Sequence, residues 1–166
     1  MKPSARIKSL MEALSAKLGD KDEALIACVD LAVLVAMADG TIDADERAAL
    51  TTALESLMRA QVAPPVVRHL IRESKSQIEA DGPEARAKAI GKQLAEHEAA
   101  DEGLRLALAI AFSSEGMCDL ERERISFVAG GAGVSDASFA ALVTAAAALP
   151  PEGGDEAAVN PQTPTP

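Results

Sequence analysis

The segment MADGTIDADE, residues 37–46, places four carboxylates around one glycine at the end of an apolar stretch. Clustered carboxylates suggest a calcium loop of the EF-hand type, which takes oxygen ligands from positions 1, 3, 5, 7, 9 and 12 and has glycine at position 6. With Gly40 at position 6, the second half of the loop fits. Positions 1 and 3 fall on Val35 and Met37, whose hydrocarbon side chains cannot ligate calcium. A standard EF-hand is therefore excluded.

Helix capping explains most of the same residues. Gly40 suits the left-handed conformation that ends a helix, and Asp43 is a natural N-cap for the helix that follows. Glu46, three residues after Asp43, completes the pattern of a capping box. Asp39 is not explained in this way, because a carboxylate in the last turn of a helix faces the negative end of the helix dipole. It therefore needs a cation, a basic side chain or a hydrogen-bond donor.

A second segment repeats the arrangement of the first. Residues 107–121 align with residues 31–45 at an offset of 76, the separation between Asp39 and Glu115. Glycine and an Asp recur in register after the acid. We therefore predict a duplicated helix–corner–helix unit, in which Asp119 is the second N-cap and Arg122 removes the second capping box.

Composition predicts an all-α fold. Apolar residues make up 48% of the 166 residues, mostly as Ala, Leu and Val, and aromatic residues only 2%. Such a core favours closely packed helices over sheets. Apolar periodicity, Gly and Pro predict a single domain of about seven to eight helices, built from two pseudo-twofold-related helix–corner–helix units. The predicted helices are residues 4–18, 21–38, 44–59, 66–78, 84–97, 101–114, 120–129 and 135–150. The second is apolar on nearly all faces and should lie at the centre.

The chain divides into three parts. We expect an N-terminal helix in residues 1–19, a helical domain in residues 20–149, and a tail in residues 150–166. The tail is acidic and rich in Pro and Gly, and it has no large apolar residue, so it should be disordered.

Charge and hydropathy limit the partners. The formal net charge is −10 and the sequence pI about 4.6, which argues against nucleic-acid binding. The N-terminus has no continuous apolar region typical of a signal peptide. The longest apolar run, residues 24–38, is shorter than the roughly 20 residues that cross a bilayer. We expect no transmembrane segment and a soluble, cytoplasmic protein.

At the first corner the chain resembles the TerB-like tellurite-resistance family. The resemblance is carried by the pattern A-D-G-x-I-x-x-x-E in residues 38–46 and by GAGVSDASFAAL in residues 131–142, which is similar to the closing segment of that family. It covers most of residues 20–148. The second corner departs from the family pattern, with Glu115 in place of Asp, Cys118 in place of Ile, and Arg122 where an acid is usual.

The resemblance implies a non-enzymatic helical module associated with tellurite and chemical-stress resistance. It also implies protein–protein interaction, with a membrane-associated complex as one setting, and weak binding of a divalent cation (Ca, Mg, Mn or Zn) by the corner acids. The candidate ligands are Asp39, Asp43, Glu46, Glu115 and Asp119. Two alternatives stay open: Arg122 could neutralise Asp39 or Asp43 without metal, or the domain could be purely structural, with corner acids that serve as caps and ion-pair partners.

Other polar residues lead to structural predictions. Asp30 lies within the most apolar helix and needs a partner, for which Arg105 is the obvious candidate. Cys28 and Cys118 lie in apolar stretches and are expected to be core residues. The two histidines lack metal-ligand spacing, and no phosphate-binding or nucleophile motif is present, so an enzyme is not expected.

Overall fold

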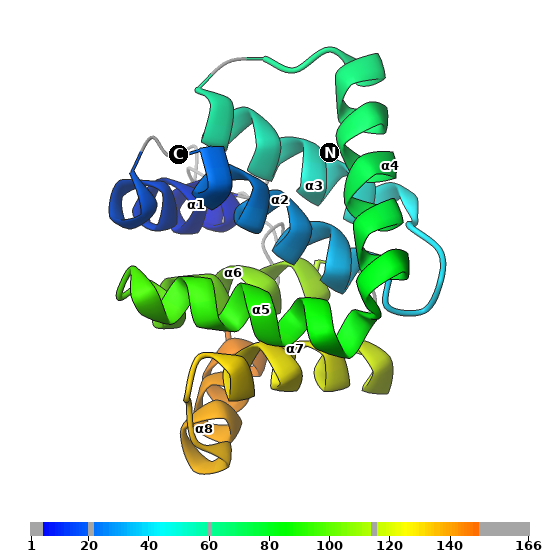
Figure 1. The fold of residues 1–166 in the computed structure, drawn as a ribbon. Coiled ribbons are helices and arrows are strands. Elements are labelled where there is room, and N and C mark those ends of the chain that lie inside the picture. Colours follow the sequence, from blue (N-terminus) through cyan, green and yellow to red (C-terminus); the bar gives the residue numbers. More distant parts are fainter. Residues whose placement is uncertain (1–4, 20–21, 60, 114–115, 150–166) are drawn as a thin grey trace, which may run out of the picture.

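The computed structural model describes residues 5–19, 22–59, 61–113 and 116–149. This part of the chain is all helical, as predicted, and contains eight α-helices and no strand (Figure 1). They are α1 (Ala5–Leu18), α2 (Asp22–Ala36), α3 (Ala44–Met58), α4 (Pro64–Asp81), α5 (Pro83–Glu96), α6 (Ala100–Ala111), α7 (Asp119–Gly131) and α8 (Asp136–Ala147). The predicted tail lies outside the described residues, and the three predicted part boundaries stay predictions.

Helix α2 occupies the centre of the molecule, as its apolar sequence predicts. Every residue from 27 to 36 is buried, and the helix contacts all of α1 and α3 to α7. Helix α6 carries the second apolar run and packs directly against α2. A helix without a polar face is stable only when other helices surround it.

Helix α1 shares the core of the other helices. Ile7, Met11, Leu14 and Leu18 recur at helical spacing and are all buried. They face α3 and α6, with which α1 makes most of its contacts. The N-terminal helix therefore packs as part of the same body.

Helices α5 and α7 lie side by side and approach each other closely at two glycines (Figure 1). A Cβ added to Gly91 would lie 2.1 Å from the carbonyl oxygen of Val128, and one added to Gly131 would lie 2.3 Å from that of Lys88. The predicted seventh helix, residues 120–129, ends before Gly130 and Gly131. That prediction is wrong, because α7 continues through both residues and the missing side chain at Gly131 lets α5 approach.

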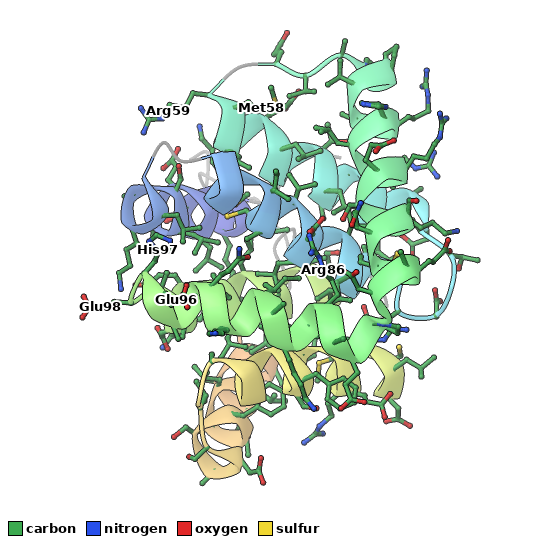
Figure 2. All side chains as sticks on the ribbon, in the orientation of Figure 1. Met58, Arg59, Arg86, Glu96, His97 and Glu98 are labelled. Carbon is green, nitrogen blue, oxygen red and sulfur yellow. The ribbon has the colours of Figure 1, made fainter. Side chains whose placement is uncertain are left out.

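The buried carboxylate of Asp30 pairs with Arg86, at the start of α5. Figure 2 shows Arg86 between α5 and the neighbouring parts of α2 and α4. Its Nε donates to Asp30 Oδ2 at 2.9 Å and its Nη2 donates to the same oxygen, while Ser74 Oγ donates to Asp30 Oδ1 at 2.6 Å. Together with Ser74, this pair connects α2, α4 and α5.

The prediction that Arg105 pairs with Asp30 is wrong. Arg105 Nε donates to Asp101 Oδ2 at 2.6 Å, one turn earlier on the exposed side of α6. The side of α6 that faces α2 is filled by apolar residues, so no cation enters there. Cys28 is a core residue as expected, and burial raises the pKa of its thiol to about 12.

Candidate cation site at two helix corners

The first corner connects α2 to α3 and has the predicted capping box. Asp43 is the N-cap of α3, and its Oδ1 accepts from the backbone N–H of Glu46 at 2.8 Å. The backbone N–H of Asp43 donates in return to Glu46 Oε2 at 2.9 Å. Gly40 has a φ of +94°, the region that favours glycine and that the sequence predicted.

The second corner connects α6 to α7 and also has a capping box, contrary to the prediction that Arg122 removes it. The N-cap is Cys118 and not Asp119: its Sγ accepts from the N–H of Glu121 at 3.5 Å, and its own N–H donates to Glu121 Oε2 at 2.6 Å. Arg122 therefore does not remove the box. Cys118 is exposed, so the prediction of a core cysteine is also wrong.

The error came from the alignment of the two corners. The glycines Gly40 and Gly116 are 76 residues apart. One residue lies between Gly116 and its cap Cys118, whereas two lie between Gly40 and Asp43. The structural counterpart of Glu46 is therefore Glu121, at an offset of 75.

Glu46 and Glu121 are the buried acids of this region. Their exposed fractions are 8% and 5%. Burial raises the pKa of Glu46, and the negative charges of Asp43, Glu121 and Asp39 raise it further. Burial likewise raises the pKa of Glu121, with Asp39 and Asp43 adding to the effect. Charges at one corner therefore act on the acid of the other corner, which places four carboxylates within electrostatic reach of one another.

One oxygen of Glu121 has no hydrogen-bond partner. Oε2 takes part in the capping box, but Oε1 is buried and accepts no bond. Within the described residues no Lys or Arg forms a salt bridge with Asp39, Asp43, Glu46 or Glu121. The proposed pairing of Arg122 with Asp39 or Asp43 is thus not present. A buried unpaired carboxylate oxygen is costly, so this one marks a position that a cation would stabilise.

The structure brings some predicted ligands together and separates others. Asp39, Asp43 and Glu46 are three of the four carboxylates that influence one another, and Glu121 is the fourth. Asp119 is exposed on the first turn of α7, and no contact places it with the others. Glu115 lies outside the described residues.

The prediction that Asp39 lies in the last turn of a helix is wrong. Helix α2 ends at Ala36, three residues earlier. Asp39 Oδ1 accepts from the backbone N–H of Thr41 at 2.9 Å and from its hydroxyl at 3.1 Å. The hydrogen-bond donor that Asp39 needs is therefore Thr41.

Sequence reasoning missed Glu121. The signal was available, because Glu121 follows Cys118 by three residues, as Glu46 follows Asp43. Cysteine is not among the preferred N-cap residues, and the alignment of the glycines hid the match.

The four acids carry oxygen atoms of the kind that bind a hard cation, but they do not form a complete ligand set. Carboxylate oxygens are the ligands that calcium, magnesium and manganese prefer. Among the described residues, no three His, Cys, Asp or Glu side chains already stand together as a metal-ligand set. Any ion held here would take the rest of its ligands from water, which is typical of weak binding.

The chain matches a protein-family model, and comparisons with curated proteins and with solved structures gave no match. The model, described as tellurite resistance protein TerB, matches residues 22–144. This range runs from α2 into α8 and includes both corners. In the part of the chain that the structure describes, no helix combines the length and the apolar character needed to cross a membrane.

Proposed function

Since the chain belongs to the TerB tellurite-resistance family, we propose that it is a non-enzymatic module that binds a divalent cation weakly at its two corners and acts through contacts with other proteins. The setting that the family suggests is resistance to tellurite and chemical stress in the cytoplasm, with a membrane-associated complex as one possible assembly. Glu46 and Glu121 are the central ligands, and Asp39 and Asp43 contribute charge.

The observation that carries the cation proposal is the buried, unpartnered Oε1 of Glu121. A carboxylate in that position is stabilised by protonation or by a cation, and four acids make the local field strongly attractive to the latter. The donors are all oxygens, which favours calcium, magnesium or manganese over zinc.

Titration calorimetry with Ca²⁺, Mg²⁺, Mn²⁺ and Zn²⁺ tests the proposal. We expect heat with at least one ion, its loss in Glu121→Gln, and its retention in Glu123→Gln, a matched change at an exposed site on the same helix. No heat from any ion would refute the proposal, and so would equal effects of the two variants.

A purely structural interaction domain is the second candidate. It is favoured by the fact that Glu46 and Glu121 each complete a capping box, and that Asp39 is already bonded to Thr41. On this alternative, adding a chelator to protein in calcium-containing buffer leaves the melting temperature unchanged. The cation proposal expects the melting temperature to fall.

A further inference from the structure

A groove of about 390 Å³ lies between α3 and α4, lined also by the segments that precede each helix. We call it the α3–α4 groove. Its floor is apolar: Val62 and Val67 are buried, and Ile42 and Ile71 are half-buried. Apolar side chains recessed in a groove are suited to receive apolar side chains of a partner.

The rim of the α3–α4 groove is cationic. Every charged residue that lines it is a cation, and these are Arg47, Arg68, Arg72 and Lys75. All four are exposed, in a protein of net charge −10. In the described part of the chain, Lys75 is the only one of the four with an ion pair, to Glu79 at 3.7 Å. Three guanidinium groups with no acidic partner are therefore available to an anionic ligand.

Three of the cationic rim residues are regularly spaced along α4. Arg68, Arg72 and Lys75 occupy positions i, i+4 and i+7 of α4, so they lie on one face of that helix. At about 1.5 Å per residue they span roughly 10 Å, or two helical turns. Carboxylates at the same spacing on a partner helix would match them in register, while apolar residues on the adjacent face would meet the floor.

We propose that the α3–α4 groove docks an acidic amphipathic helix of a partner protein. This proposal rests on the protein–protein contact of the proposed function, because it specifies the chemistry of the partner in that contact. It does not require that a cation is bound at the corners. Charge complementarity supports it, because arginine is enriched at protein interfaces and opposite charges steer association. A bilayer fits less well, because the apolar residues of the floor lie below the charged rim, where a flat surface does not reach them.

Fluorescence anisotropy with a labelled 18-residue peptide tests the proposal. The peptide carries leucines on one helical face and glutamates on the faces that flank it, so that both can meet the groove. Controls are a scrambled peptide of the same composition without a continuous apolar face, and a peptide with lysine in place of glutamate. We expect saturable binding of the first peptide only, with an affinity that falls as salt screens the rim.

Charge reversal on the protein supplies the matched comparison. Arg72→Glu should weaken peptide binding at least tenfold, and Arg68→Glu should do so independently. Lys92→Glu makes the same charge change at an exposed site on α5 that does not line the groove, and it should alter binding less than twofold. These side chains are exposed, so helicity by circular dichroism should be unchanged in all three variants.

Several results would overturn the proposal. One is equal binding of the scrambled peptide, and another is equal loss in Arg72→Glu and Lys92→Glu. Binding to vesicles of phosphatidylglycerol and phosphatidylcholine, lost in Arg72→Glu and without peptide binding, would assign the groove to a membrane. A dimer in sedimentation that Arg72→Glu disperses would assign it to a second copy of the chain.

Two further variants separate the remaining possibilities. The protein with Glu152→Gln, Asp155→Asn and Glu156→Gln should bind the peptide as the wild type does. A tenfold gain would assign the groove to the acidic C-terminal segment of the chain itself and overturn the proposal. Peptide binding should persist in Glu121→Gln and in chelator, so failure of the cation site and failure of the groove are distinguishable.

Discussion

Replacement of Arg86 by Met should strongly destabilise the protein. The change removes the guanidinium from Asp30 but keeps an unbranched side chain of similar length. Two donors to Asp30 Oδ2 are lost, and the hydroxyl of Ser74 on Oδ1 stays. The Asp30 side chain is only 3% exposed, so water cannot replace the lost donors fully.

The expected magnitude follows from burial. Loss of one partner from a buried ion pair costs about 3–5 kcal/mol, because the other charge is left uncompensated. The side chain of Arg86 is 23% exposed, and the bond from Ser74 remains, so the cost should lie at the lower end, about 3 kcal/mol. This is a large share of the roughly 5–15 kcal/mol that stabilises a typical domain.

Arg105→Met is the matched control. It removes the ion pair with Asp101, whose two side chains are 49% and 56% exposed. An exposed pair of this spacing contributes about 0.3–0.5 kcal/mol. The same substitution should therefore have very different effects at the two arginines.

Urea unfolding followed by circular dichroism measures the difference. We expect Arg86→Met to lower the midpoint with an unchanged slope, and the double variant Asp30→Leu/Arg86→Met to recover most of the loss, since it leaves no buried charge unpaired. A cost below 1 kcal/mol for Arg86→Met, or an equal cost for Arg105→Met, would refute the assignment of Arg86 as the partner of Asp30.

Three further predictions concern the corners and the contact between α5 and α7. In the presence of a chelator, the free energy of unfolding should fall as the pH rises from the ordinary glutamate pKa of about 4.5 through the raised pKa of Glu121 in the folded protein. The reason is that the fold disfavours the ionised form of Glu121, so the fold loses stability as this acid is deprotonated. Urea unfolding at several pH values should show a shallower fall in Glu121→Gln. Gly131→Ala should lower the melting temperature because its methyl would overlap the backbone of α5, whereas Gly130→Ala, in open space on the same helix, should raise it. Asp43→Ala should cost about 1 kcal/mol in urea unfolding, and Cys118→Ala less, because a thiol is a weak acceptor; an equal cost would contradict the capping geometry.

The sequence predicted most of the fold from local signals. The eight helices, the central position of α2 and the capping box of Asp43 and Glu46 follow from apolar periodicity and from residues within one turn of each other. A backbone hydrogen bond or a cap joins residues that are near neighbours along the chain. Such features can be predicted from a short window.

The errors involve residues that are distant in sequence or sensitive to register. Asp30 and Arg86 are 56 residues apart, and Arg105 was an equally reasonable cation until the packing of α5 against α2 was known. One residue fewer between Gly116 and the second cap moved the buried acid from the expected position to Glu121. Neither the pairing of Asp30 with Arg86 nor the one-residue difference at the second corner changes where the helices are predicted.

The sequence alone thus determined that this protein is a helical domain with a capped, acidic first corner, because those properties depend on side chains within a few residues. Tertiary structure decided that Glu46 and Glu121 are both buried and influence each other across the corners. It also decided that one oxygen of Glu121 has no partner and that Arg68 and Arg72 line an apolar groove. Burial and the distances between charges depend on how the helices pack, because they are set by residues that are far apart in the sequence.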